Sequence, residues 1–335
     1  MKKILIIQTA YIGDVILATS LVEYIKGQLP ECKIHFLLRK GNESLLEENP
    51  QIEKVWVWDK GKKFSSMFSI ISGLREEKFD YTFNIQRFTN SAIFTLMSGA
   101  NQKIGFKSNI LSLFFSKAIE HKIPYNYQDT FLHEVQRNFL LIQDIIKKDI
   151  PSKENLKPKL YFTEQDHKKI EDLNLPSDYI VLAPASVWFT KQWPKDHWQT
   201  LLELLGGQNC YFIGAPTDID FINRIIGKNQ NAKNLAGKLN LRQSALLMKD
   251  ARRVIVNDSA PLHLASSVNA KTSALFCSTV PDFGYGPLSD DAKTLQIMPR
   301  LECMPCGLHG KKECPQGHFK CALEVDVDAV TQRSF

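Results

Sequence analysis

The segment most typical of a binding site is a predicted strand that leads into Asp258. A predicted helix with Pro261 in its first turn follows it. Pro261 suits the first turn of a helix and biases Ala260 toward an extended backbone, which predicts Ala260 as the N-cap. Alanine has no side-chain oxygen to offer the free amides, so these remain available to an anion such as phosphate. The polar residues around this predicted anion site are Asp258, Ser259 and His263. Taken alone, the segment also fits an ordinary helix start capped by Ser259.

Three further loops that follow predicted strands carry a charged residue beside a helix start. Asp14, after the first strand, either caps the next helix or serves as a general base for a hydroxyl. Lys191 lies between aromatic residues just before Trp193-Pro194, where a point charge suits phosphate oxygens. Asp218 either caps a helix or hydrogen-bonds a ribose. The first of these loops has too few glycines for a dinucleotide fingerprint, which disfavours a nicotinamide or flavin site.

Four cysteines and a histidine near the end of the chain follow the pattern Cys-x2-Cys-x7-Cys-x3-His-x2-Cys. They are Cys303, Cys306, Cys314, His318 and Cys321. In a reducing cytoplasm this clustering favours thiolate ligands for a structural zinc over disulfides, and the ligand type equally allows iron. Because the spacing matches no standard zinc finger, free or oxidisable thiols remain the alternative.

The composition is that of a globular protein large enough for two domains, with 335 residues of which 44% are hydrophobic. Its longest apolar run, near Ile110–Phe115, is far shorter than the ~20 residues that cross a bilayer. The start resembles a signal peptide, but Gln8, Gly13 and Asp14 interrupt the apolar run. We therefore expect a cytoplasmic protein.

The net charge of +6 favours an anionic substrate or an anionic membrane surface as a partner. No tract of Lys and Arg interleaved with aromatic residues indicates a nucleic acid partner. In the first half of the chain, Lys62, Lys63 and Arg87 are among the cations available to an acidic acceptor. A solvated basic surface is the alternative for each of them.

Short apolar runs alternate with amphipathic segments, which predicts an α/β architecture of two doubly wound parallel sheets. The expected strands are Lys3–Gln8, Lys33–Leu38, Val55–Trp58, Tyr81–Ile85, Gly105–Phe106, Ile119–Ile123, Tyr179–Ala183, Cys210–Ile213, Asn234–Leu235, Arg253–Val256 and Ser273–Phe276. The expected helices include Val15–Leu29, Phe131–Lys148 and four that start at Lys195, Asp218, Asn240 and Pro261.

A polar, proline-bounded stretch at 150–158 reads as a linker. We predict domains at 1–157 and 158–325, with the Cys-rich segment 303–321 in the second, and a tail at 326–335. In open α/β sheets ligands bind beyond the carboxyl ends of the strands, where all the loops described above are expected.

The order of these motifs along the chain resembles the ADP-heptose:lipopolysaccharide heptosyltransferases of glycosyltransferase family 9, most closely their heptosyltransferase II branch. The motifs are Ile12-Gly13-Asp14, Lys191-x-Trp193-Pro194, Gly214-Ala215-Pro216, Leu235-Ala236-Gly237, Asn257-Asp258-Ser259 with His263-Leu264-Ala265, and Ser278-Thr279-x-Pro281. The resemblance implies a GT-B fold, with two Rossmann-like domains facing each other across a cleft. It also implies an inverting transfer that requires no cofactor.

The resemblance further implies a role for each matching residue. Asp14 corresponds to the base that deprotonates the acceptor hydroxyl. The residues that match donor-binding positions are Lys191 and Ser186 for the diphosphate, Asp218 for the ribose, Gly237 and Leu239 for the adenine, Asp258 for the heptose hydroxyls, and Ser259, Ala260 and His263 for the phosphates. The acceptor is expected near Gly13, Arg87, Lys62 and Lys63.

The expected reaction moves heptose from ADP-L-glycero-D-manno-heptose to the lipopolysaccharide inner core, by an enzyme in peripheral contact with the inner face of the cytoplasmic membrane. The chain departs from the family pattern at Ala260, where glycine is common, at Thr19-Ser20, and loosely at 84–87. Two alternatives stay open. One is a GT-B transferase or epimerase with another nucleotide sugar, and the other is a non-catalytic nucleotide-sugar-binding protein.

Overall fold

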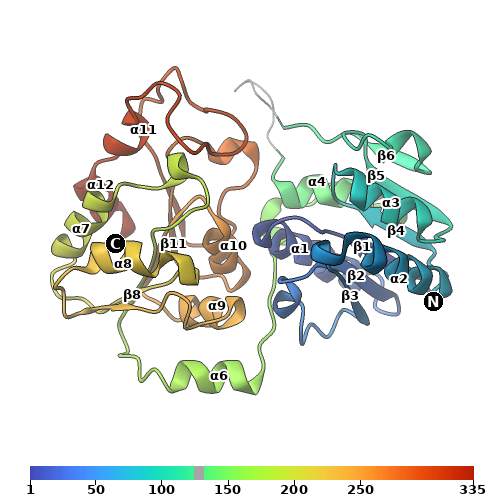
Figure 1. Ribbon diagram of the computed structural model, residues 1–335, viewed down its shortest axis with the longest axis horizontal. Helices are drawn as coiled ribbons and strands as arrows, with labels where there is room; N and C mark the ends of the chain where they lie inside the picture. Colours follow the sequence, from blue (N-terminus) through green and yellow to red (C-terminus); the bar gives the residue numbers. More distant parts are fainter. Residues whose placement is uncertain (124–131) are drawn as a thin grey trace. The chain divides into compact units, whose positions relative to one another are not determined.

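The computed structural model describes residues 1–123 and 132–335, which divide into two compact units. The first unit spans Met1–Tyr161 and the second Phe162–Phe335, so the division lies a few residues beyond the predicted linker. Each unit contains a six-stranded, wholly parallel sheet with helices on its faces (Figure 1). The α/β class predicted from the sequence is confirmed for both halves of the chain.

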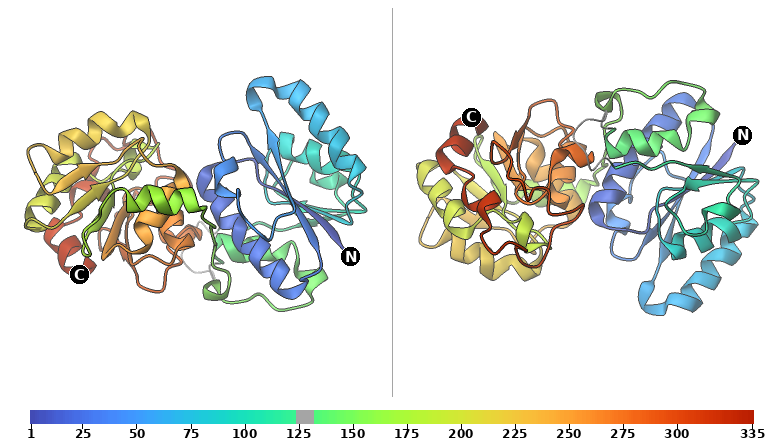
Figure 2. Two further views of the ribbon diagram at one scale, coloured as in Figure 1. Left: turned by 90° about the horizontal axis from the view of Figure 1, so that it is seen from below. Right: turned by 90° about the horizontal axis from the view of Figure 1, so that it is seen from above.

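The first unit is built on a sheet of strand order β3-β2-β1-β4-β5-β6. Its strands are β1 (Lys3–Ile7), β2 (Lys33–Arg39), β3 (Lys54–Trp58), β4 (Tyr81–Asn84), β5 (Gln102–Phe106) and β6 (Lys117–Ile119). Its helices are α1 (Ile12–Gln28), α2 (Lys63–Glu76), α3 (Thr89–Met97), α4 (Glu134–Leu140) and α5 (Gln143–Ile146). Helices α1 and α4 pack together, and α2 packs with α3 (Figure 2). The central strand β1 is apolar almost throughout because helices cover both faces of the sheet.

The second unit has the same construction, with the strand order β12-β11-β10-β7-β8-β9. Its strands are β7 (Ile180–Ala183), β8 (Cys210–Phe212), β9 (Ala232–Asn234), β10 (Arg253–Asn257), β11 (Thr272–Leu275) and β12 (Ala292–Leu295). Its helices are α6 (Glu164–Glu171), α7 (Lys195–Leu204), α8 (Ile219–Ile226), α9 (Leu241–Lys249), α10 (Ala260–Ser267), α11 (Lys320–Leu323) and α12 (Val327–Ser334). Strands β7 and β10 are neighbours, with Ala183 opposite Val256.

The predicted N-cap of α10 and one predicted strand were wrong. The N-cap of α10 is Ser259, whose backbone is extended, while Ala260 is already helical and Pro261 stands in the first turn. The ring of Pro261 is tolerated there because first-turn amides have no partner within the helix. The predicted strand at 119–123 lies earlier, as β6. The predicted tail at 326–335 contains α12, whose N-cap Asp326 accepts a hydrogen bond from the Ala329 amide.

The long helix predicted for 131–148 is two short helices, and residue 131 lies outside the described residues. The break has a local cause. The amides of Leu141 and Ile142 donate to carbonyls three residues back, at 3.2 and 2.9 Å, rather than four. This tighter turn ends α4, and the chain resumes as α5 after Ile142. A hydrophobic stripe alone does not report such a change of hydrogen bonding.

Candidate active site

The carboxyl edge of the second sheet brings Lys191, Asp258 and Thr279 into contact, although 21 or more residues separate them along the chain. The Lys191 Nζ lies 2.7 Å from Oδ2 of Asp258. The Thr279 hydroxyl donates to the same oxygen at 2.5 Å. Asp258 is almost fully buried, and most of the Lys191 side chain is covered as well. The motif order predicts both residues at a donor site, and the structure shows that they form one charged pair.

Asn257, the last residue of β10, fixes the distance between the two loops that carry this pair. Its side-chain oxygen accepts from the Trp193 amide at 3.2 Å, and its side-chain nitrogen donates to the Pro184 carbonyl at 2.6 Å. Both partners belong to the loop after β7, whose 3-10 turn Phe189–Lys191 presents the lysine. Because Asn257 is fully buried, these bonds are shielded from water and hold Lys191 beside β10.

The start of α10 lies beside the charged pair. Pro261 has no N–H, and the Leu262 amide donates to the Ser259 carbonyl at 3.0 Å, which leaves the Ala260 amide as the first-turn donor with no partner among the described residues. Ser259 makes no side-chain capping bond, since its hydroxyl donates instead to the carbonyls of Ala185 and Asn257, both at 3.4 Å. The helix begins without an acidic residue in its first turn. Such an N-terminus presents an open amide donor and the positive end of the helix dipole, which suits a phosphate.

His263 is buried in the first turn of α10, close enough to Lys191 and Asp258 for their charges to affect it. Desolvation lowers the pKa of His263 to about 4; the Asp258 carboxylate partly opposes this shift and Lys191 adds to it. The imidazole is therefore neutral near pH 7 and can both donate and accept a hydrogen bond. Its Nδ1 has no hydrogen-bond partner within the described residues, so it remains available to a ligand.

The loop after β7 is also fastened to the Cys-rich segment. The Thr190 amide donates to the Lys311 carbonyl, and the Thr190 carbonyl accepts from the Ser278 amide. The Thr190 hydroxyl accepts from the Lys311 amide at 2.8 Å. The Ser278 hydroxyl donates to the Thr190 hydroxyl at 2.9 Å. Ser186, predicted for the diphosphate, lies in this loop, where its carbonyl accepts from Gln192 at 2.6 Å. The end of the chain thus supports the residues around Lys191.

Gly310 leaves no room for a side chain beside Lys191. A Cβ at this position would lie 2.5 Å from the Cβ of Trp188 and 2.9 Å from the Cγ of Lys191. We expect Gly310→Ala to lower the free energy of unfolding by ~1–3 kcal/mol and to weaken donor binding, because the loop must move. Thermal melts and donor titration measure both effects. Gly27→Ala is the matched control, since a Cβ there meets nothing within 4 Å; an equal effect of the two changes would contradict the prediction.

The loops after β8 and β9 hold the residues predicted for the nucleoside. Asp218 accepts a hydrogen bond from the Ala215 amide at 2.8 Å, which is the capping role that the sequence left open. Gly237 has φ +70°, and its amide donates to the Gly214 carbonyl at 3.0 Å. The structure thus brings these two loops together, with Leu239 two residues beyond Gly237 and partly exposed. Their contact with a nucleoside stays a prediction.

In the first unit, Asp14 lies in the first turn of α1, directly after β1. Its carboxylate accepts from the Tyr11 amide at 3.2 Å, so it does cap the helix. It is also partly desolvated: burial, and then the negative charge of Glu134, raise the pKa of Asp14 from 3.8 to about 6. The cations Arg39 and Arg87 oppose this shift. A carboxylate with a pKa near 6 is matched to accept a proton near neutral pH.

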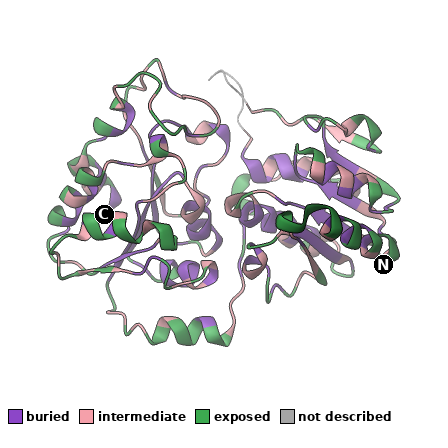
Figure 3. Ribbon diagram, viewed as in Figure 1, coloured by how far each residue is buried: buried purple, intermediate pink, exposed green. Residues whose placement is uncertain are grey.

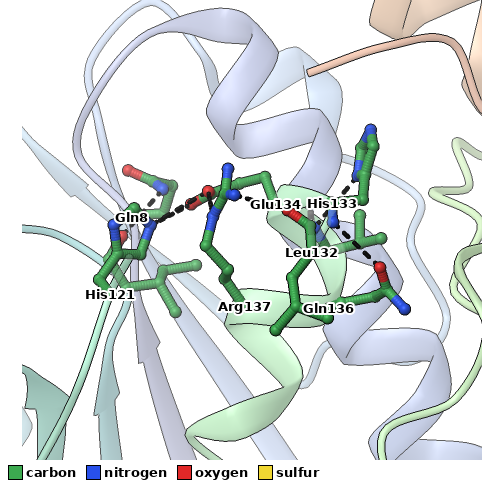
Figure 4. A network of polar contacts seen from close by, with 9 residues as sticks. Gln8, His121, Leu132, His133, Glu134, Gln136 and Arg137 are labelled. Atoms are coloured by element: carbon green, nitrogen blue, oxygen red, sulfur yellow. Dashed lines mark hydrogen bonds and ion pairs between the residues drawn. The ribbon is translucent and has the colours of Figure 1, made fainter. Parts of the chain in front are cut away.

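Glu134 belongs to a buried polar network that the sequence analysis did not identify (Figure 4). Its carboxylate pairs with Arg137 Nε at 2.7 Å and with His121 Nε2 at 3.1 Å. Although burial opposes ionisation, Arg137 and His121 lower the pKa of Glu134 to about 2. Glu134 is therefore a permanent negative charge close to Asp14. No sequence pattern links the two, because α4 reaches α1 only through packing.

The predicted acceptor residues lie in the loops and helix starts that follow the strands at the carboxyl edge of the first sheet. Gly13 follows β1, Lys62 and Lys63 follow β3, and Arg87 follows β4. Both lysines and Arg87 are exposed. Arg87 is near enough to Asp14 to lower its pKa, so at least this cation belongs to the surroundings of the candidate base.

The predicted metal site is not assembled. Within residues 1–123 and 132–335, no three His, Cys, Asp or Glu side chains are arranged to hold a metal ion. Cys303 Sγ lies 3.9 Å from the His318 Nε2, while Cys306 donates to the Cys303 carbonyl and Cys314 accepts from the Phe319 amide. Cys321 is a buried residue of α11. The thiols are thus directed toward local partners, and the cysteines of this segment are free.

Comparison with known proteins accounts for this arrangement. Residues 67–318 match the model of glycosyltransferase family 9 (heptosyltransferase). The chain belongs to glycosyltransferase family 9. It is 26% identical to lipooligosaccharide heptosyltransferase 2 of Haemophilus influenzae over 319 residues, which cover 88% of each chain. It is 24% identical to lipopolysaccharide heptosyltransferase 3 of Escherichia coli over 279 residues, covering 80% of this chain and 81% of the relative.

The fold of this family 9 glycosyltransferase is that of a solved relative as well. The structure of E. coli ADP-heptose lipopolysaccharide heptosyltransferase II superposes with a TM-score of 0.76 at 20% identity, covering 99% of each chain. The GT-B fold predicted from the motif order is thereby confirmed. The heptosyltransferase II branch is among the relatives, as is heptosyltransferase 3.

Residues that the sequence analysis did not assign complete the site. Thr279 and Ser278 had appeared only as part of a motif, yet the first holds Asp258 and the second holds Thr190. The sequence clue to both residues was their place in the loop that follows a buried strand, at the sheet edge where ligands bind. Thr190 gave no signal, because its contacts with Ser278 and Lys311 span 88 and 121 positions of the chain. Gly310 gave none either, because its neighbours Trp188 and Lys191 are similarly distant in the sequence.

Proposed function

We propose that this family 9 glycosyltransferase moves heptose from ADP-heptose to a lipopolysaccharide core acceptor. The observation that carries the proposal is the Lys191–Asp258 pair beside the uncapped start of α10. A cation and a free helix amide stabilise a diphosphate leaving group, and a buried carboxylate accepts hydrogen bonds from sugar hydroxyls. We take the sugar and the acceptor from the names of the relatives, which are lipooligosaccharide and lipopolysaccharide heptosyltransferases, one of them named for ADP-heptose.

Within this proposal the donor lies along the carboxyl edge of the second sheet. Lys191, Ser186 and the first turn of α10, with Ser259, Ala260 and His263, contact the diphosphate. Asp258 accepts hydrogen bonds from heptose hydroxyls. When the donor binds, these bonds replace part of the contact between Asp258 and Lys191. Asp218 contacts the ribose, while Gly237 and Leu239 line the adenine position. Gly237 has a positive φ, and a Cβ at this position would lie 3.2 Å from the Cα of Pro216. Both features favour glycine there.

Asp14 is the proposed general base, acting on the acceptor hydroxyl while the bond from the anomeric carbon to the diphosphate breaks. Attack from the face opposite the leaving group inverts the configuration in a single displacement. Lys191 and the α10 N-terminus supply the charge stabilisation that a divalent cation provides in other transferases, so we propose that the reaction requires no metal. The arrangement in which the two units face each other across a cleft is part of the same proposal.

The proposed acceptor contacts are Gly13, Arg87, Lys62 and Lys63, which share the carboxyl edge of the first sheet with Asp14. Their positive charges suit an anionic core. The enzyme would act in peripheral contact with the inner face of the cytoplasmic membrane, where such an acceptor is anchored.

The test is a product assay with defined substrates. The protein is incubated with ADP-heptose, other ADP-sugars and UDP-sugars, each with truncated lipopolysaccharide cores, and the products are identified by mass. The proposal expects addition of one heptose from ADP-heptose alone. Transfer of another sugar, isomerisation of the donor without transfer, or binding without turnover would each replace the proposed function with one of its alternatives.

The pH dependence of the reaction reports the charge on Asp14. Because its pKa is raised to about 6, kcat/KM should increase with pH and level off above that value. Glu134→Gln removes a negative charge that raises this pKa, so the acidic limb should move to lower pH while the plateau persists. The measurement is kcat/KM from pH 4.5 to 8.5 in both proteins. An unmoved limb in the variant would show that Glu134 does not act on the titrating group.

A further inference from the structure

We propose that the start of α2, with Lys60, Lys62, Lys63, Phe64 and Phe68, is a docking surface for an anionic lipid bilayer. The inference deepens the proposed function, on which it rests for the position of the acceptor. It assigns the contact with the membrane to one helix end and to named side chains. This segment is called the α2 surface below.

The two phenylalanines lie on the solvent side of α2. Phe64 and Phe68 are 70% and 68% exposed, and as residues i and i+4 they occupy one face of the helix. The adjoining stripe of the helix, with Met67, Ile70, Ile71 and Leu74, is buried in the core of the first unit. Figure 3 shows the exposed outer side of this helix. The core is formed by the buried stripe, whereas Phe64 and Phe68 remain mostly exposed to solvent.

Lysines directly precede these rings. Lys60 and Lys62 lie in the 3-10 turn before α2, and Lys63 is its first residue. All three side chains are exposed, and the Lys63 Nζ lies 5.7 Å from the centre of the Phe64 ring. Exposed aromatic rings beside lysines are the pattern of helices that bind the interface of an anionic membrane. An apolar protein partner would explain the rings but not the lysines.

The charge distribution of the whole chain agrees with an anionic partner for the first unit. Residues 1–161 contain 23 Lys and Arg against 17 Asp and Glu, whereas residues 162–335 contain 19 of each. The entire net charge of +6 therefore belongs to the unit that carries the α2 surface. Among the described residues, no helix is both long and apolar enough to cross a membrane. A surface contact with anionic lipid fits this asymmetry.

The α2 surface also lies at the edge of the sheet that carries Asp14. Both follow the carboxyl ends of parallel strands, β3 and β1, which are separated only by β2. Neighbouring strands are ~4.8 Å apart, so the strand ends are about 10 Å from each other. A lipid-anchored acceptor could thus keep its acyl chains in the bilayer while its sugar reaches the base.

Binding of the full-length protein to vesicles tests the proposal. Vesicles of phosphatidylcholine alone are compared with vesicles that contain phosphatidylglycerol, at low and high salt, by co-sedimentation. We expect binding only to the anionic vesicles, weakened by salt. Lys62→Gln with Lys63→Gln should weaken it about 30-fold, since each lysine near such a surface contributes roughly fivefold. Phe64→Ser with Phe68→Ser should weaken it about tenfold or more.

Two matched controls make the test specific. Lys168→Gln with Lys169→Gln removes an exposed adjacent pair from α6 in the second unit and should leave vesicle binding within about twofold of wild type. Phe114→Ser removes a ring with the same 70% exposure from the connection between β5 and β6, where Lys107 is paired with Glu120, and should also have little effect. Equal losses in a control and in the matching α2 variant would overturn the proposal.

The remaining outcomes separate this inference from the proposed function. Phe64→Ser with Phe68→Ser should retain transfer to an acyl-free, water-soluble core acceptor, because neither ring belongs to the site. Absence of transfer by the wild type to that acceptor would contradict the proposed function and leave the vesicle result standing. Absence of wild-type binding to anionic vesicles overturns the membrane assignment. In that case, a dimer that the Phe64→Ser, Phe68→Ser variant loses would assign the surface to a second copy of the chain.

Discussion

Asp14→Asn is expected to lower kcat by roughly 10²–10⁴-fold, the range that a positioned general base contributes. Asparagine keeps the size of the side chain and can still accept the hydrogen bond from the Tyr11 amide, so the start of α1 should be preserved. What it removes is the proton acceptor. The measurement is the steady-state rate with saturating donor and a verified acceptor, together with the donor dissociation constant, which should not change.

The stability of the same variant distinguishes a lost base from a damaged fold. Because desolvation raises the pKa of Asp14 to about 6, the folded state holds this carboxylate charged at pH 7 at a cost in free energy. The pKa of this carboxyl is higher in the folded protein than in the unfolded one. Its contribution to the free energy of unfolding therefore decreases as the pH rises through the interval between the two pKa values. Asp14→Asn should therefore melt at or above the wild-type temperature at pH 7. Near-normal turnover in the variant would falsify the assignment of Asp14 as base.

Lys191→Ala is expected to weaken donor binding by about 100-fold and also to slow transfer, because one cation is removed from the diphosphate and from the leaving group. The effect is enlarged by Asp258. Its buried carboxylate loses the partner at 2.7 Å and, within residues 1–123 and 132–335, keeps the Thr279 hydroxyl alone, so an uncompensated negative charge remains where the diphosphate must bind. Titration of the ADP-sugar and single-turnover transfer separate the two effects.

Lys195→Ala provides the matched control for this prediction. Lys195 starts α7, only four residues later, and its partly exposed side chain pairs with the exposed Asp196 at 3.1 Å. An exposed pair of this kind contributes little to stability, and the residue has no contact with Asp258 among the described ones. Donor affinity should therefore be near wild type. If both lysine variants bound the donor equally, Lys191 would have no special role in holding the diphosphate.

The second sheet shows how far local sequence predicts a site. The apolar run before Asp258 predicted β10, and the proline after it predicted a helix, which begins within one residue of the expected place. The loop with Lys191 was likewise found from the strand before it and the Trp-Pro after it. These predictions succeeded because a buried strand and a helix start are encoded by neighbouring residues.

The predictions that the structure does not support depended on local hydrogen bonding, which residue type and spacing do not specify. Cysteine spacing in the last part of the chain fits a metal site, yet the side chains turn to the backbone carbonyls and amides nearest to them. The stripe from 132 to 148 fits one helix, yet hydrogen bonds three residues apart end it at Leu140. In both cases residue type and spacing are compatible with the prediction but do not require it.

The sequence alone determined the α/β class, most of the strands, the loops that carry the polar residues and the family they resemble. Only the tertiary structure decided that Lys191 contacts Asp258, that Gly310 packs against Lys191, and that Glu134 acts on Asp14. The reason is physical. Periodicity and capping act over a few residues, whereas the order β11-β10-β7-β8 and the packing of α4 on α1 depend on how whole elements bury their apolar faces. The spacing of residues along the chain therefore does not predict which side chains meet through such packing.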